Sequence, residues 1–189
     1  MTNIRIATAD DIAGLYRVSE DMNAINEPDY FDRCIAEQDE KKRIIYVAEQ
    51  KSGDDMRLVG YVQLVWVPTY ATFRRLGIPE IQDLNVIPDL RGQGIGSRLI
   101  DACETEACAA GKTEMGISVG LTQSFGPAQR LYVKKGYIPD GTGMCYDDVP
   151  VRAESLRTTL WHSAPMLNNF LTIKMVKELS VSLKPFTPI

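Results

Sequence analysis

A glycine-rich turn between a strand and a long helix constrains this chain more than any other feature. The turn spans Val86 to Ser97 and carries glycine at every second position from Gly92 to Gly96. The first N–H groups of a helix have no acceptor within the helix, and the helix dipole adds partial positive charge there. Glycine lets an anion approach those N–H groups because no Cβ stands in the way. The sequence therefore predicts a phosphate site at this turn.

The spacing of the glycines separates the known kinds of phosphate loop. A P-loop requires Lys-Ser or Lys-Thr after its last glycine, and neither follows Gly96. A dinucleotide-binding loop would require glycine in place of Ser97, and Pro88 interrupts its passage from strand to turn. The spacing that fits is Arg-x-x-Gly-x-Gly, formed by Arg91, Gly94 and Gly96. It resembles the coenzyme A pyrophosphate loop of the GNAT superfamily of N-acetyltransferases, and an ordinary helix-capping turn is the alternative.

A second segment carries the other half of this resemblance. The residues from Phe125 to Tyr137 are similar to the A-x-x-L-Y-x-x-x-G-[FY] signature of the late helix in GNAT enzymes. The run G-P-A-Q-R-L-Y-V-x-x-G-Y-x-P-D-G, from Gly126 to Gly141, also resembles bacterial GNAT proteins of undefined substrate. The two signatures occur in the family's order, and the resemblance extends from Ile4 to about Lys174. One position departs, because Phe125 stands where many members have an asparagine that contacts the cofactor.

Hydrophobic patterning predicts strands that alternate with helices. Strands are expected at residues 4–7, 44–49, 57–67, 81–86, 115–119, from 137 onward and at 169–174, and helices at 10–21, 31–38, 96–110 and from 126 onward. Residues 68–78 are expected to be irregular, and residues 139–143 to form a turn. The resemblance implies an α/β (mixed α+β) GNAT fold: a central, mostly antiparallel twisted sheet of about seven strands, helices on both faces and one splayed parallel strand pair. We expect a single domain over residues 1–179 and a flexible tail over 180–189.

Composition limits the partners of the protein. Its formal charge is −4, and its four cysteines and single histidine, His162, show no metal-ligand spacing. An acidic balance argues against nucleic acid, and the spacing argues against a zinc site, so neither is expected. No apolar run reaches membrane-spanning length, and scattered cysteines suit a reducing cytoplasm. We therefore expect a cytoplasmic protein with a small-molecule or peptide partner and no membrane partner. Homodimers are common in the family, and the sequence leaves that state open.

The resemblance also implies where acetyl-CoA binds. Its pantetheine arm is expected along the open backbone edge at residues 84–87, and its pyrophosphate on the N–H groups of residues 92–97. The implied cofactor-binding residues are Leu84, Asn85, Val86, Ile87, Arg91, Gly92, Gln93, Gly94, Ile95, Gly96, Ser97 and Ser124, the last in place of the family's asparagine.

Tyr132 matches the family's tyrosine that protonates the leaving thiolate. A phenol suits this task because it can donate a hydrogen bond while neutral at about pH 7. The alternative is that Tyr132 only packs in the core from one face of its helix. The transition-state oxyanion is expected to bind a backbone N–H near Val86.

Two carboxylates are candidates for the general base, Asp83 and Glu80. Simple strand alternation places Asp83 and Asn85 on one face, and Gln82, Leu84 and Val86 on the other. Asp83 would then lie one strand step from the thioester. Each has a structural alternative, Asp83 as a hydrogen-bond acceptor for a loop and Glu80 as a solvated residue at the strand start.

The sequence thus indicates an acetyl-CoA-dependent N-acetyltransferase that acylates a primary amine of a small molecule or peptide directly. The alternative function is a non-catalytic acyl-CoA-binding sensor with the same fold, and retention of Tyr132 favours the enzyme. Composition does not name the acceptor amine.

Overall fold

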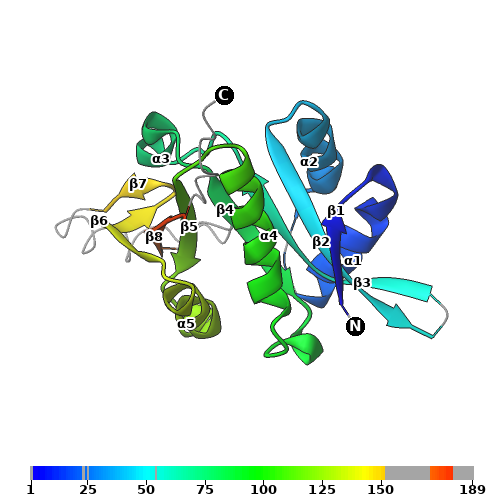
Figure 1. Ribbon diagram of the computed structural model, residues 1–189. Helices are drawn as coiled ribbons and strands as arrows, with labels where there is room; N and C mark the ends of the chain where they lie inside the picture. The colour runs from blue at the N-terminus through cyan, green and yellow to red at the C-terminus, as the bar shows by residue number, and fades with distance from the viewer. Residues whose placement is uncertain (1, 23, 25, 54, 152–170, 181–189) are drawn as a thin grey trace, which may run out of the picture.

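One sheet of eight strands organises the part of the chain that the structure describes. The structure is a computed structural model, and it describes residues 2–22, 24, 26–53, 55–151 and 171–180. The strand order is β1-β2-β3-β4-β5-β8-β6-β7 (Figure 1). Among these described strands, β4 and β5 form the one parallel pair, and the other neighbours are antiparallel. The expected α/β fold is confirmed, with eight strands in place of about seven.

The elements alternate along the chain largely as the patterning predicts. The strands are β1 (Asn3–Ile6), β2 (Arg43–Ser52), β3 (Asp55–Val65), β4 (Glu80–Val86), β5 (Glu114–Gly120), β6 (Ile138–Tyr146), β7 (Val149–Pro150) and β8 (Leu171–Glu178). The helices are α1 (Ile12–Asp21), α2 (Tyr30–Asp39), α3 (Ala71–Leu76), α4 (Ile95–Ala109) and α5 (Gly126–Lys134).

One expected irregular connection is a helix. Helix α3 lies within residues 68–78, because burial of Tyr70 and Phe73 stabilises a turn of helix that local patterning does not favour. The two rings pack edge to face with centroids 4.8 Å apart. Phe73 also covers Gly116 so closely that a Cβ at that glycine would collide with the ring.

The expected turn at residues 139–143 is an irregular part of strand β6. The pairing register with β8 shifts between Pro139 and Met144, and Gly141 and Gly143 there have φ values of 86° and 85°. Glycine tolerates this backbone, so the run bulges without ending the strand. Strand β8 continues to Glu178, beyond the expected end at residue 174. His162, the expected strand start at residue 169 and tail residues 181–189 lie outside the described residues.

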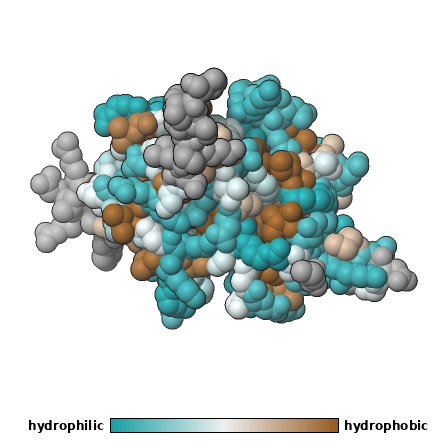
Figure 2. All heavy atoms as spheres, viewed as in Figure 1, coloured by the Kyte–Doolittle hydropathy of each residue, from teal (hydrophilic) through white to brown (hydrophobic). Residues whose placement is uncertain are grey.

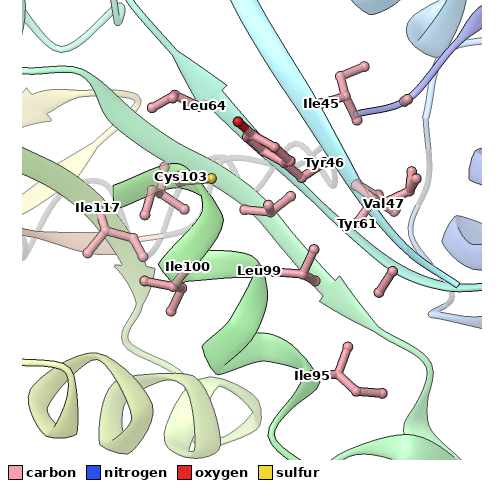
Figure 3. Packing of buried hydrophobic residues seen from close by; sticks show 14 of the residues in the cluster. Ile45, Tyr46, Val47, Tyr61, Leu64, Ile95, Leu99, Ile100, Cys103 and Ile117 are labelled. Carbon is pink, nitrogen blue, oxygen red and sulfur yellow. The ribbon is translucent and has the colours of Figure 1, made fainter. Parts of the chain in front are cut away.

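Helix α4 packs its apolar face on one side of the sheet. Its residues Ile95, Leu99, Ile100 and Cys103 are buried at helical spacing. They belong to one buried cluster with Tyr46 and Leu64 on the central strands and Ile117 on β5 (Figure 3). This packing fixes the N-terminus of α4 beside the end of β4.

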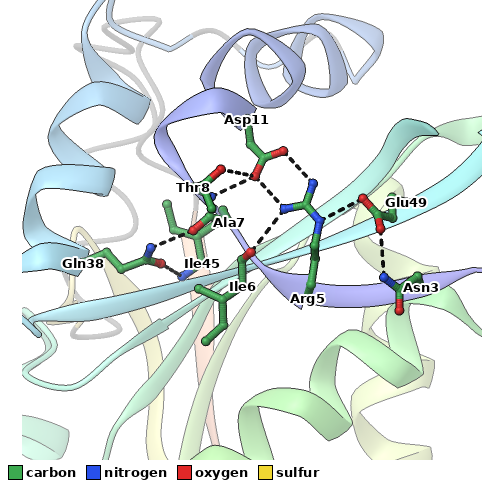
Figure 4. A network of polar contacts seen from close by, with 9 residues as sticks. All are labelled: Asn3, Arg5, Ile6, Ala7, Thr8, Asp11, Gln38, Ile45 and Glu49. Carbon is green, nitrogen blue, oxygen red and sulfur yellow. Dashed lines mark hydrogen bonds and ion pairs between the residues drawn. The ribbon is translucent and has the colours of Figure 1, made fainter. Parts of the chain in front are cut away.

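Helices α1 and α2 cover the opposite face, held by polar contacts at the end of β1 (Figure 4). Arg5 donates hydrogen bonds to Asp11 at 2.7 Å and to Glu49 at 2.9 Å. The hydrogen bond from Arg5 lowers the pKa of Asp11. Gln38 on α2 donates to the Ala7 carbonyl at 2.9 Å and accepts from the Ile45 N–H at 2.8 Å. These contacts fix α2, and therefore its first residue, relative to the sheet.

Large exposed apolar side chains are dispersed over several elements. They are Ile6, Met56, Val67, Leu76, Leu121, Val133, Ile138 and Val149. On the face drawn in Figure 2, hydrophobic residues form separate patches among polar ones. None of the described helices is long and apolar enough to cross a membrane. The described residues also contain no group of three or more metal-ligating side chains.

Candidate active site

Strands β4 and β5 pair only at their beginning. The pairs are Glu80 with Gly116 and Ile81 with Ile117, and beyond them the later part of β4 has no β5 partner. The Ile87 N–H donates to the Val59 carbonyl of β3 at 3.0 Å. Because backbone N–H groups alternate in direction along a strand, the Val86 N–H points to the unpaired edge. The predicted splay and its open backbone edge are therefore present.

The turn after β4 presents backbone N–H groups in an open setting. Gly92 and Gly94 have φ values of 77° and 81°, and a Cβ at either would meet nothing within 4 Å. Among the described residues, the N–H groups from Gly92 to Ser97 have no protein acceptor, and helical bonding starts with the Arg98 N–H. Open glycines and unpaired N–H groups at a helix N-terminus fit a phosphate group.

Gly96 lies where the loop, β4 and α5 meet. A Cβ built there would lie 3.4 Å from Leu131 of α5 and 3.8 Å from Leu84 of β4. The next residue of α5 is Tyr132, so the candidate acid lies beside the end of the splay and the candidate phosphate loop.

A β-bulge in β4 places Asp83. The register pairs Tyr61 with Asn85 and Gln63 with Gln82, so that Asp83 and Leu84 lie together opposite one residue of β3. Asp83 has a φ of 49°, in the left-handed region that aspartate tolerates better than most residues.

This bulge corrects the expected side of Gln82. The side chains of Gln63 and Asp83 are hydrogen-bonded, and Gln82 is the cross-strand partner of Gln63, so all three share one face. The expectation that Gln82 lies with Leu84 and Val86 is wrong because alternation fails at the bulge.

The Asp83 carboxylate is held by one oxygen. Oδ2 accepts hydrogen bonds from the Tyr30 hydroxyl and, at 2.9 Å, from Gln63 Nε2. No described residue donates to Oδ1, and Asp83 is exposed. The surrounding protein raises the pKa of Asp83, and the Tyr30 hydrogen bond and the Arg43 charge offset that rise only in part. Oδ1 is thus a carboxylate oxygen free to accept a proton.

Glu80 has a different environment. It is fully buried, with Oε1 accepting from the Ser118 hydroxyl and, at 3.1 Å, from Lys174, and Oε2 accepting from Gln82 at 2.9 Å. Lys174 also pairs with Asp148 at 2.5 Å. A carboxylate with both oxygens occupied is a poor candidate for accepting a substrate proton, so the geometry favours Asp83 over Glu80 as the base.

The Tyr132 ring is buried with 5% of its surface exposed. Its hydroxyl has no hydrogen-bond partner among the described residues. Burial, and then the negative charge of Asp83, raise the pKa of Tyr132, which keeps the hydroxyl protonated and able to donate.

Two predicted cofactor residues are engaged within the protein. Arg91 Nε donates to the Val86 carbonyl at 3.1 Å, so its guanidinium links the loop to the end of β4. The Ser124 hydroxyl lies 2.8 Å from that of Thr122 in the turn that follows β5. Phe125, next to it, covers Gly120 so closely that a Cβ at that glycine would collide with its ring.

Three residues around Asp83 are not apparent from the sequence motifs. They are Tyr30, Gln63 and Arg43, which donates to Gln63 Oε1. Gln63 carries a usable signal, because it is the only amide or charged residue from Val59 to Val67. A polar side chain in such an apolar strand needs a hydrogen-bond partner when buried.

Comparison with known sequences gives one family. Residues 41–139, more than half of the chain, match the model of the acetyltransferase (GNAT) domain. The aminoalkylphosphonate N-acetyltransferase of Salmonella typhimurium is 42% identical over 60 residues. That match covers 32% of this chain and 38% of the relative, so it spans well under half the length of that protein.

Solved structures share the fold over almost the whole chain. NAA60 of Arabidopsis thaliana, in complex with a bisubstrate analogue, has a TM-score of 0.70 at 15% identity, over 96% of this chain and 100% of that one. The N-acetyltransferase of Staphylococcus aureus Mu50 has a TM-score of 0.67 at 14% identity, over 95% of this chain and 99% of that one. The structure of yncA from Salmonella typhimurium with its cofactor acetyl-CoA has a TM-score of 0.63 at 18% identity, over 95% of this chain and 94% of that one. By its sequence match and its fold, the chain belongs to the acetyltransferase (GNAT) family of acyltransferase enzymes.

Proposed function

We propose that this protein transfers an acetyl group from acetyl-CoA directly to a primary amine of a small molecule or peptide. The observation that carries the proposal is the meeting of three parts around Gly96: the loop with unpaired N–H groups, the unpaired edge of β4, and α5 with Tyr132. A relative solved with acetyl-CoA and another named as an N-acetyltransferase support it.

Each part has a separate task in this reaction. Acetyl-CoA supplies the acetyl thioester, and the loop from Gly92 to Ser97 binds its pyrophosphate through backbone N–H groups. The Val86 N–H donates to the carbonyl oxygen as negative charge develops there. Asp83 Oδ1 takes the proton of the acceptor ammonium, freeing the lone pair that forms the new C–N bond. Tyr132 donates its hydroxyl proton to the sulfur as the C–S bond breaks. The nitrogen loses its second proton to solvent as the amide forms, and solvent returns a proton to Tyr132.

The remaining cofactor contacts are proposed on the same basis. The edge of β4 supplies Leu84, Asn85, Val86 and Ile87, the loop supplies Arg91 and Gly92, Gln93, Gly94, Ile95, Gly96 and Ser97, and Ser124 lies after β5. We also propose one domain over residues 1–179, because every described strand joins one sheet. A cytoplasmic location is proposed from the four free cysteines, which suit a reducing compartment.

Amine-dependent release of the coenzyme A thiol tests the proposal. The purified protein is incubated with acetyl-CoA and a panel of primary amines, and each amine is examined by mass spectrometry for a gain of one acetyl group. The proposal predicts that at least one amine raises thiol release and is acetylated. Tight binding of acetyl-CoA without amine-dependent release would instead identify an acyl-CoA sensor.

A substitution in the loop tests the cofactor site separately. Gly94→Val places a Cβ on the open face and strains a φ of 81°, so acetyl-CoA affinity should fall at least about tenfold. Gly53→Val is the matched control, because Gly53 also has a positive φ, 65°, and open space but lies in the β2–β3 turn. If calorimetry finds equal acetyl-CoA affinity in folded Gly94→Val and Gly53→Val proteins, the loop does not bind the cofactor.

A further inference from the structure

We propose that Tyr30, anchored by Gln63, positions Asp83 and sets the lower pH limit of acetyl transfer, an inference that rests on the proposed function. Tyr30 would be a positioning residue, since its contact is with the base and not with the reacting atoms. Nothing in the sequence motifs points to it.

The contacts form a continuous path from α2 to β4. Tyr30, the first residue of α2, donates to Asp83 Oδ2 and accepts from Gln63 Nε2 at 2.9 Å. Gln63 is fully buried and also donates to Oδ2 at 2.9 Å. Arg43 fixes the other end of the Gln63 amide and pairs with Glu37. The two donors to Oδ2 fix the orientation of the carboxylate, and in that orientation Oδ1 remains available to the substrate.

The groups that act on Asp83 come from four elements. They are Tyr30 and Cys34 of α2, Arg43 of β2, Tyr61 of β3 and Tyr132 of α5. Among these described groups, Arg43 is the one cation, and it reaches Asp83 through Gln63. Tyr30 is thus the one titratable group that donates a hydrogen bond directly to the carboxylate.

The Tyr30 hydrogen bond favours the ionised form of Asp83 and so lowers the pKa of that carboxyl group against the rise that desolvation by the surrounding protein causes. Burial, and then the charge of Asp83, raise the pKa of Tyr30 well above its usual value, so it stays a donor throughout the neutral range. Loss of the hydroxyl lets Asp83 take up a proton at higher pH. The acid limb of turnover should then move upward, while turnover at alkaline pH, where Asp83 is ionised in both proteins, should converge.

Tyr30→Phe tests the proposal, with Tyr16→Phe as its matched control. Both rings pack edge to face on Phe31, at centroid distances of 5.0 Å and 4.9 Å, but the Tyr16 hydroxyl donates to the Pro28 carbonyl. We measure kcat against pH at saturating substrates with two amines of different basicity, because a limb that belongs to the amine moves with the amine. Tyr30→Phe should shift the amine-independent acid limb up by roughly one pH unit, or about tenfold in turnover on that limb. Tyr16→Phe should not shift it.

Equal loss of turnover at every pH in Tyr30→Phe, or an equal shift in Tyr16→Phe, would overturn the inference. If Tyr30→Phe does not fold, Gln63→Met provides the same test, since it removes the second donor to Oδ2 and the anchor of Tyr30. Asp83→Asn separates this inference from the proposed function. An amine-independent acid limb that disappears in Asp83→Asn but does not move in Tyr30→Phe contradicts only the role of Tyr30. An amine-independent limb that persists in Asp83→Asn contradicts the assignment of Asp83 as base and, with it, this inference.

Discussion

Replacing Tyr132 by phenylalanine should lower turnover by roughly 10²- to 10⁴-fold, the range typical of a lost general acid. The ring stays buried and its packing is preserved, so folding and acetyl-CoA affinity should be nearly unchanged. Only the hydroxyl is removed, and within the described chain it has no other hydrogen bond to lose. The measurement is single-turnover kinetics with an amine that the wild-type protein acetylates.

Tyr137→Phe is the control for this substitution. Tyr137 is buried beside Tyr132, with ring centroids 6.3 Å apart, but its hydroxyl donates to Glu104 at 3.0 Å. Its loss should reduce stability and leave single-turnover rates close to those of the wild type. A Tyr132→Phe protein with the wild-type single-turnover rate would show that Tyr132 only packs in the core.

Lys174→Met should lower the free energy of unfolding by about 3–5 kcal/mol, because it leaves the buried Glu80 carboxylate, and the half-buried one of Asp148, without their cation. Lys174 has 2% of its surface exposed and pairs with Glu80 and Asp148. Burial alone lowers the pKa of Lys174, but the two carboxylates more than offset this and raise it, so the ammonium is charged. Methionine keeps most of the side-chain volume and removes that charge. Chemical denaturation measures the loss.

Lys177→Met, on the same strand, is the comparison. Lys177 pairs with one carboxylate, Glu104, which keeps the hydrogen bond from Tyr137 when the lysine is removed. Lys177→Met should therefore lower the free energy of unfolding clearly less than Lys174→Met does. Adding Glu80→Gln to Lys174→Met should recover part of the stability, since it removes one of the uncompensated charges. An equal decrease in the free energy of unfolding in the two lysine variants would mean that the contacts of Lys174 with Glu80 and Asp148 stabilise the fold no more than an ordinary ion pair does.

Local sequence patterns predict most of the fold, because the periodicity of a helix or strand and the φ values of a turn each require certain residue types at a fixed spacing. Apolar residues at helical spacing define α4, and the glycines from Gly92 to Gly96 mark the turn before it. Helix α3 escapes prediction because its stability comes from burial of Tyr70 and Phe73 against distant strands. Residues 139–143 contain the usual turn residues, yet pairing with β8 on either side of them keeps them within strand β6.

The candidate site is predictable only where its groups belong to continuous motifs. The loop and Tyr132 belong to such motifs, whereas the bulge at Asp83 depends on pairing with β3 and has no signature of its own. Tyr30 and Asp83 are 53 positions apart in sequence, and only the packing of α2 on the sheet brings them together. The choice between Asp83 and Glu80 likewise depends on a lysine from β8, which no local pattern connects to β4.

Whether Asp83 accepts the amine proton is measured most directly by the pH dependence of turnover in Asp83→Asn. Asparagine keeps the size of the side chain and tolerates the φ of 49° at this position. At a pH where the acceptor amine is mostly protonated, turnover should fall by roughly 10²-fold or more, with acetyl-CoA affinity unchanged. Turnover should recover toward the wild-type value as pH rises through the pKa of the amine, because a free amine needs no base. A pH profile identical to that of the wild type would contradict the assignment and leave Asp83 a structural carboxylate.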